Sequence, residues 1–447
     1  MLIKTIFPVM KTVGILVLCL FFPIILSCVP AAGDADSFVK VENGKFVKDS
    51  KPYYFAGANM WYAAMLASDG EGGDRERLER ELDCLDSMGV DNIRVLVGAD
   101  GDNWTPMKVG PTLQVRPGVY NDSIFNGLDY LLAELGKRDM TAVLYLTNSW
   151  EWSGGFGQYL EWAGFGRTPL PKEVSWGEYC AILTQFYDSP QARDMYFNHV
   201  KSVVSRVNAI TGRPYSEDPA IFSWQLCNEP RPFSDENKED FLSWARESAA
   251  IIKSIDTNHL VSTGSEGLFG CEVDSSLFVR LHSLEDIDYF NIHIWPYNWN
   301  WVDKGNLDSV NIAIDESRKY IGIHTDAVSD AGKPLVIEEF GYPRDGFSFS
   351  KDSSVSARDI YYRYIFDIVI ESARSGGCIA GCNFWAWGGY AGQSSESEYW
   401  RRGDDYCGDP AQEPQGLYSV YAGDSTTVEL VRETNELIAT ATAGIEM

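Results

Sequence analysis

Three glutamates follow short apolar runs of the kind that form buried strands. Glu229 lies just beyond the run 221–226, and Glu338 and Glu339 lie just beyond the run 334–337. Side chains alternate between the faces of a strand, so we expect only one of Glu338 and Glu339 to point toward Glu229. Two carboxyl groups about 5 Å apart can cleave a glycosidic bond with retention, one as nucleophile and the other as general acid and then base. The residue types predict that chemistry.

A structural role is the alternative for each glutamate. A single glutamate at a strand end usually caps a helix N-terminus or pairs with an arginine. Here there are two such positions, and Glu229 is flanked by Asn228 and Pro230. This combination favours a functional pair of carboxylates.

The elements that must position these carboxylates are eight candidate strands that alternate with helical patterns from about Phe38 onward. Such alternation is typical of repeated βα units around a parallel sheet. No Gly-x-Gly-x-x-Gly motif or P-loop follows an early strand, so an α/β fold with a single (β/α)8 TIM barrel is favoured over an open doubly wound sheet. The candidate strands are residues 53–56, 92–97, 141–146, 221–226, 260–262, 289–293, 334–337 and 381–385.

Helices are predicted between the strands by apolar residues at a spacing of 3.6. One pattern runs from Leu78 to Met88 and stops at Gly89, and another runs from Val200 to Ile210 and stops at Gly212. The glycines are expected to end both helices.

Two long connections are expected to decorate the barrel mouth. Residues 148–177 follow the third strand and are rich in Gly and Trp, while residues 388–416 follow the eighth and are rich in Gly, Ser and acidic residues. Both are too long for simple connections. We expect them to wall a cleft at the C-terminal ends of the strands, where the fourth and seventh strands face each other.

These motifs resemble glycoside hydrolase family 5, and within it the endo-β-1,4-mannanases, from Phe38 to about Tyr421. The triplet around Glu229 resembles the acid/base motif of the family, and Glu339, directly before Phe340 and Gly341, matches its nucleophile. The resemblance implies a retaining mannan endo-1,4-β-mannosidase that hydrolyses internal β-1,4-mannosidic bonds by double displacement and acts on a β-mannan polysaccharide or oligosaccharide.

Further strand ends carry the same resemblance. Arg94 matches the second-strand arginine that keeps the nucleophile ionised, His293 the sixth-strand histidine, and Trp385 the eighth-strand tryptophan that floors the subsite of the sugar being cleaved. Asn228 is expected to bond the 2-hydroxyl of that sugar. The family usually has a tyrosine where this chain has Trp295, and an indole donates one hydrogen bond but accepts none, so the surroundings of the nucleophile are expected to differ.

The mannanase assignment rests on fewer residues. Asn148 and Trp150 resemble the third strand of mannanases, and Trp150 is expected to line a subsite. Arg231 is expected to bind a leaving-side sugar, with a surface ion pair as the alternative. Trp61 is either a sugar platform or part of the core.

Composition limits the partners. A net charge of −27 would repel a phosphate backbone, so no nucleic-acid partner is expected. The 14 Trp, 23 Tyr and 22 Phe suit the faces of sugar rings, although they also suit a barrel core. Cys378 and Cys382 lack a second ligand pair, so we expect no metal and no cofactor. We also expect a monomer.

The N-terminus predicts export. Residues 1–27 resemble a lipoprotein signal peptide whose lipobox ends at Cys28, and residues 28–37 resemble a tether before a catalytic domain at 38–447. Contact with the membrane is then expected only through a lipid anchor on Cys28, in the periplasm or at the cell surface. A plain signal peptide is the alternative.

Three rival functions stay open. The same fold and chemistry could serve a β-1,4-glucanase, or a β-mannosidase acting on short oligosaccharides. A glycan-binding lipoprotein without catalysis is a third, disfavoured by both strand-end carboxylates.

Overall fold

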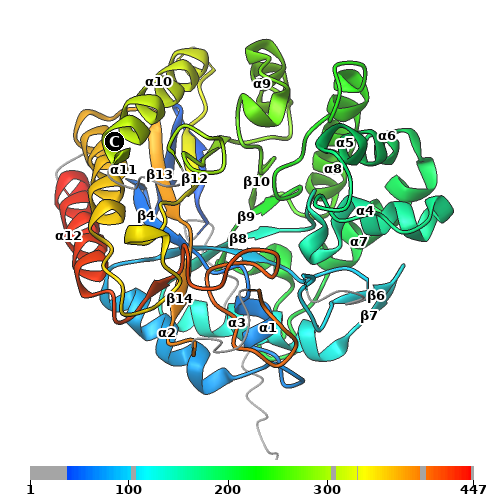
Figure 1. Ribbon diagram of the computed structural model, residues 1–447, viewed down its shortest axis with the longest axis horizontal. Helices are drawn as coiled ribbons and strands as arrows, with labels where there is room; N and C mark the ends of the chain where they lie inside the picture. The colour runs from blue at the N-terminus through cyan, green and yellow to red at the C-terminus, as the bar shows by residue number, and fades with distance from the viewer. Residues whose placement is uncertain (1–37, 102–106, 304–308, 330, 393–398, 444–447) are drawn as a thin grey trace, which may run out of the picture.

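Eight parallel strands form a barrel that helices surround in the computed structural model, which describes residues 38–101, 107–303, 309–329, 331–392 and 399–443 (Figure 1). Each predicted strand overlaps one of them. They are β4 (Phe55–Asn59), β5 (Asn92–Leu96), β8 (Thr141–Tyr145), β9 (Ile221–Gln225), β10 (Leu260–Ser262), β11 (Phe290–Ile294), β12 (Leu335–Phe340) and β13 (Ile379–Phe384). The predicted signal peptide, Cys28 and the tether lie outside the described residues.

The order of strands in the sheet confirms the predicted barrel. It runs β10-β9-β8-β5-β4-β13-β12-β11, with every neighbouring pair parallel. The two outer strands meet through backbone bonds from Asp288 N to Val261 O at 2.8 Å and from His293 N to Glu266 O at 3.3 Å. These bonds close the ring, so the ends of all eight strands surround one mouth.

Helices cover the outside of the barrel, and α11 packs against both α12 and β13 (Figure 1). The helices are α1 (Ala63–Leu66), α2 (Arg75–Ser87), α3 (Asp122–Lys137), α4 (Gly155–Leu160), α5 (Trp176–Leu183), α6 (Gln185–Asp188), α7 (Pro190–Val204), α8 (Lys238–Ile255), α9 (Ser275–His282), α10 (Val310–Val328), α11 (Ser356–Ser375) and α12 (Ser425–Thr442). None of the helices described is long and apolar enough to cross a membrane.

Shorter strands lie outside the barrel sheet. An antiparallel sheet of β1 (Lys40–Glu42), β2 (Lys45–Lys48) and β3 (Lys51–Pro52) precedes β4. Two further pairs are β6 (Gln114–Arg116) with β7 (Val119–Tyr120) and β14 (Trp387–Gly389) with β15 (Val420–Tyr421). The last pair ties the chain on both sides of the long loop after β13.

Local signals explain where α2 begins and ends. Asp74 accepts a hydrogen bond from Arg77 N at 2.9 Å and so caps the helix, whose Leu78 and Leu82 are fully buried. Gly89 follows with a φ of 71°, a left-handed conformation that glycine adopts without steric cost. The predicted helix and its stop are both confirmed.

The second predicted helix ends earlier than its apolar pattern. Helix α7 stops at Val204, and Val207 and Ile210 are 54% and 50% exposed. Asn208 is the reason, because its side-chain oxygen accepts from Ile210 N at 2.9 Å and from Thr211 N at 3.1 Å. Such local bonds compete with helical ones. The prediction that the helix continues to Gly212 is therefore wrong.

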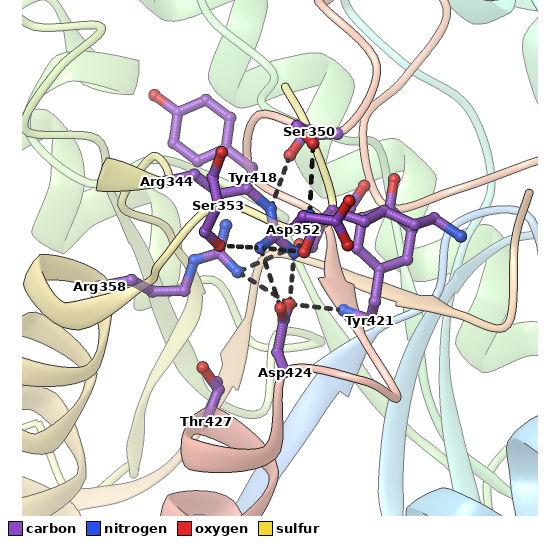
Figure 2. A network of polar contacts seen from close by, with 12 residues as sticks. Arg344, Ser350, Asp352, Ser353, Arg358, Tyr418, Tyr421, Asp424 and Thr427 are labelled. Atoms are coloured by element: carbon purple, nitrogen blue, oxygen red, sulfur yellow. Dashed lines mark hydrogen bonds and ion pairs between the residues drawn. The ribbon is translucent and has the colours of Figure 1, made fainter. Parts of the chain in front are cut away.

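Buried ionic contacts anchor the loops that follow β12 and β13 (Figure 2). Asp424, which precedes α12, accepts from Arg344 Nη1 at 2.9 Å and Nη2 at 2.5 Å and from Tyr421 N at 2.9 Å. Arg358 on α11 reaches the same carboxylate at 3.4 Å and also donates to Leu417 O at 3.2 Å. The Asp424 carboxylate therefore joins three segments: the loop after β12, helix α11 and the segment before α12.

Replacing Asp424 by alanine is expected to lower the free energy of unfolding by about 3–5 kcal/mol, because two buried guanidinium groups lose their ionic partner. Unfolding in urea measures the change. The control is Asp315→Ala, which removes an exposed pair with Arg318 and should change stability by less than about 0.5 kcal/mol. Equal effects of both substitutions would contradict the anchoring role.

Candidate active site

The two predicted catalytic carboxylates converge at the barrel mouth. Glu339 is on β12 and Glu229 follows β9, the seventh and fourth barrel strands. One carboxylate oxygen of each and one ring nitrogen of His293 all lie within 4.8 Å of one another. This separation matches the spacing of about 5 Å that retaining glycosidases use for nucleophile and acid/base.

The backbone at Glu229 directs its side chain into the mouth. Glu229 has a φ of 51°, which is unfavourable for a residue with a Cβ and is tolerated where the surroundings hold it. Its N–H donates to Gly264 O at 2.8 Å, and the N–H of Asn228 donates to Thr147 O at 2.8 Å. Neighbouring strand ends thus fix the conformation.

Two cationic side chains hold Glu339, the predicted nucleophile. Arg94 Nη1 donates to Glu339 Oε1, and His293 Nδ1 lies 3.3 Å from Glu339 Oε2. Burial alone would raise the pKa of the Glu339 carboxyl, but His293 and Arg94 outweigh it and keep that pKa below its ordinary value. Glu339 is therefore ionised, as a nucleophile must be.

Arg94 is fully buried, and its other hydrogen bonds fix it in place. Its Nε donates to Gln225 Oε1 at 2.8 Å, its Nη1 to Asn59 Oδ1 at 3.2 Å, and its Nη2 to Asn228 Oδ1 at 2.7 Å. One guanidinium group thereby aligns Glu339 with Asn228.

The side chains of Glu338 and Glu339 point in different directions because of a β-bulge, and not because of simple alternation along the strand. In the pairing of β11 with β12, Ile292 faces Ile337 but His293 faces Glu339, so Glu338 is left out of register. Its carboxylate accepts from Gln225 Nε2 at 2.6 Å and from the Tyr289 hydroxyl at 2.8 Å. Of the two glutamates, only Glu339 lines the cavity, as expected. Glu338 lies outside the cavity lining and holds the side chain of Gln225.

His293 links the two carboxylates. Its Nδ1 lies 2.7 Å from Glu229 Oε1, and Trp150 Nε1 donates to Glu229 Oε2. Burial opposes the charged imidazolium, but Glu339 and Glu229 outweigh it and raise the pKa of His293 to about 9. The three side chains are close enough to hold a metal ion. Because Arg94 and Trp150 already donate to the two carboxylates, the set fits carboxylate catalysis instead.

A cavity of about 300 Å³ opens beside the catalytic pair. Both long connections contribute walls, as predicted: residues 148–177 supply three tryptophans, and residues 388–416 supply Pro410, Gln412 and Glu413. Indole faces beside carboxylates are well suited to sugar rings. The lining residues are Trp150, Trp152, Trp176, Asn228, Glu229, Arg231, Glu266, Trp295, Asn298, Trp299, Glu339, Trp385, Pro410, Gln412 and Glu413.

Most of the predicted substrate-binding residues line this cavity. They are Trp150, Asn228, Arg231, Trp295 and Trp385. The ring of Trp295 packs edge-on against Trp385 and Tyr418, with ring centres 5.8 Å and 5.3 Å apart. Within the described chain, its side chain makes such ring contacts and no hydrogen bond. Trp295 therefore shapes the wall and does not replace the usual tyrosine as a donor to the nucleophile.

Asn148 and Trp61 lie away from the cavity. Asn148 is fully buried, accepts from Trp150 N at 3.1 Å and Asn228 Nδ2 at 3.2 Å, and donates to Ser153 Oγ at 2.9 Å. It supports Trp150 and Asn228 from behind. Trp61 donates to Gly408 O at 3.0 Å and packs edge-on against Trp152. Of its two predicted roles, the structure gives Trp61 the core role.

Arg231 lies at the cavity wall and makes an ion pair with a buried glutamate, so it is not part of a surface ion pair. It lines the cavity and lies 5.5 Å from the ring centre of Trp150 and 5.9 Å from that of Trp176. It also pairs with Glu266 at 2.5 Å. Glu266 was missed from the sequence, although it lies four residues beyond β10, where the strand-end rule would have found it. Trp176, at the start of α5, and Glu413, in the loop between β14 and β15, carry no such signal.

Comparisons with known proteins agree with this geometry. The family model described as GH family 5 beta-mannosidase-like matches residues 36–442. The chain is similar to the putative mannan endo-1,4-beta-mannosidase 9 of Oryza sativa subsp. japonica, with 33% identity over 387 residues that cover 84% of this chain and 88% of the relative. It is also similar to mannan endo-1,4-beta-mannosidase 1 of Arabidopsis thaliana, with 32% identity, covering 78% and 81%.

Among solved structures, the chain is similar to a glycoside hydrolase family 5 mannosidase of Rhizomucor miehei in complex with mannosyl-fructose. The TM-score is 0.85 and the identity 33%, covering 92% of this chain and 100% of the other. The family match and these relatives span most of the chain with its carboxylate pair, so the chain belongs to the β-mannosidase-like group of glycoside hydrolase family 5.

Proposed function

We propose that the protein is a retaining endo-β-1,4-mannanase that hydrolyses internal bonds of β-mannan. The observation that carries this proposal is the convergence of Glu229 and Glu339 within 4.8 Å beside a tryptophan-lined cavity. Relatives at 33% and 32% identity are named mannan endo-1,4-beta-mannosidases, and these names supply the substrate class.

The first step forms a covalent intermediate. The ionised carboxylate of Glu339 attacks the anomeric carbon, while Glu229 donates a proton to the departing glycosidic oxygen. The aglycone leaves with that proton, and an ester joins the sugar to Glu339. Arg94 and His293 stabilise the ionised Glu339 beforehand.

The second step releases the sugar. Glu229, now ionised, takes a proton from water, and the resulting hydroxide attacks the anomeric carbon and frees Glu339. Asn228 lines the cavity between Arg94 and Asn148 and is suited to bond the 2-hydroxyl of the reacting sugar.

An exo-acting β-mannosidase is the second candidate. The TM-score of 0.85 to the Rhizomucor miehei mannosidase favours it, as does the loop after β13 that adds Gln412 and Glu413 to the cavity wall. Both candidates use the same catalytic residues, so product size separates them.

Activity should be present on galactomannan and nearly absent on carboxymethylcellulose, with manno-oligosaccharides as early products. Reducing-sugar release and chromatography of products measure this. The matched blank is Glu339→Gln, which removes the nucleophile and should retain less than about one percent of activity. Mannose as sole early product would favour the exo-acting candidate, and turnover of cellulose alone would contradict both.

Glu229→Gln tests the division of roles between the carboxylates. It should lose turnover of mannan, yet still release a good leaving group such as dinitrophenol from an aryl mannoside, because that group needs no proton. Glu339→Gln should lose both reactions. The reverse pattern would exchange the two assignments.

Arg94→Gln should move the acid limb of the pH profile of kcat/KM to higher pH. Glu339 must be ionised, and its pKa is lowered by His293 and Arg94 against the effect of burial, so loss of Arg94 raises that pKa. Initial rates on a neutral manno-oligosaccharide at low substrate concentration measure the shift. Arg231→Gln is the control, since its partner is Glu266. An unmoved acid limb in Arg94→Gln would contradict the role of Arg94.

We also propose that the protein is exported and anchored by a lipid on Cys28. Support comes from the apolar run before Cys28 and from the short polar segment after it. Cys28→Ala should move the protein from the membrane fraction to the soluble fraction, whereas Cys84→Ala, which changes a half-buried thiol of α2, should not. An unchanged fractionation of Cys28→Ala would contradict the anchor.

A further inference from the structure

Glu413 is a fourth carboxyl group at the cavity, beside Glu229, Glu339 and Glu266, and one of its oxygens has no hydrogen-bond partner within the described chain. Glu413 lies in the loop between β14 and β15, and its Oε2 is buried and has no hydrogen-bond partner within the described chain. The neighbouring Gln412 Oε1 is in the same condition, and both residues line the cavity. Buried polar atoms are nearly always hydrogen-bonded, so two unpartnered oxygens on adjacent residues of the cavity lining mark a place where a ligand can form hydrogen bonds.

The surroundings of Glu413 disfavour its ionised form. Burial is the largest effect that raises its pKa, and the carboxylates of Asp409 in the same loop, Glu339 on β12 and Glu229 after β9 add to it. The other ionisable groups at its side are the phenols of Tyr297 and Tyr418. Burial and the three carboxylates hold the pKa of Glu413 well above the ordinary range, and no cation in the described chain offsets them.

The position of Glu413 is fixed by its own loop. Asp409 accepts from the backbone N–H groups of Gly416 at 2.8 Å and Tyr418 at 2.7 Å. Gln415 Nε2 donates to Glu413 O at 3.1 Å and to Pro410 O at 2.9 Å. The hydrogen bonds and ion pairs of Asp424 lie just beyond the C-terminal end of this loop, after β15 (Figure 2). These bonds fix the backbone that carries Glu413, so its carboxyl group is presented to the cavity from a well-held loop.

We propose that Glu413 is a specificity-determining residue that donates a hydrogen bond from its neutral carboxyl group to a hydroxyl of the mannosyl substrate. Gln412 Oε1 accepts from a hydroxyl beside it, so the pair offers one donor and one acceptor. This inference rests on the proposed function and deepens it.

Because Glu413 binds the substrate through its neutral carboxyl group in this proposal, the affinity for the substrate depends on pH. Below the pKa of Glu413 the carboxyl group keeps its proton and can donate. Above that pKa the donor is lost, and a further negative charge is added near Asp409 and Glu339. KM should therefore rise on the alkaline side in the wild type.

Two substitutions of Glu413 test the proposal through kcat and KM for mannotriose from pH 5 to 9. Glu413→Ala should raise KM about three- to tenfold at pH 6, the loss expected for one neutral hydrogen bond, with kcat within about twofold. Glu413→Gln keeps a donor at every pH, so its KM should stay within about twofold of wild type at pH 6 and lose the alkaline rise. Glu285→Gln, an exposed glutamate outside the cavity, is the control.

The outcomes separate this proposal from the proposed function. Wild-type KM in a folded Glu413→Ala would show that Glu413 does not contact substrate. Equal losses in both substitutions would show that the ionised carboxylate is the binding form, and either result overturns the proposal. A wild type that cleaves cello-oligosaccharides but not mannotriose would instead overturn the proposed function.

Discussion

The buried ion pair between Arg94 and Glu339 is the constraint that organises the barrel mouth. A guanidinium group without water must have partners for its donors, because an uncompensated buried charge costs several kcal/mol. Arg94 finds four partners on three strands and their ends: Asn59 on β4, Gln225 and Asn228 on and after β9, and Glu339 on β12. The same contacts that stabilise the cation therefore fix the acid/base loop relative to the nucleophile.

The barrel and the catalytic pair could be predicted because both follow from local rules. Apolar runs and helical periodicity mark the strands, and the C-terminal ends of parallel strands meet at one mouth. Glu229 and Glu339 end the fourth and seventh strands, so barrel topology alone brings them together. The same rule reaches Arg94 and His293, which lie in the C-terminal parts of the second and sixth strands, one or two residues before each strand ends.

The rest depended on contacts that one strand or helix does not reveal. Periodicity extended α7 to Ile210, but the Asn208 side chain bonds the backbone there and ends the helix earlier. Alternation separated Glu338 from Glu339, yet a bulge set by the pairing with β11 makes the separation. Trp61 and Trp150 are both tryptophans beyond strand ends, and only tertiary packing places one in the core and the other at the cavity.

Charge balance connects the catalytic pair with the outer wall of the cavity. Three buried cationic side chains lie at the mouth: Arg94 pairs with Glu339, Arg231 with Glu266, and His293 with Glu229. Glu338 and Glu413 remain without an ion pair in the described chain, and for both burial is the main cause of a raised pKa. A neutral carboxyl group is an acid that keeps its proton as a hydrogen-bond donor. Glu338 already accepts hydrogen bonds from Gln225 and Tyr289, whereas Glu413 Oε2 has no partner in the described chain and stays open to a ligand.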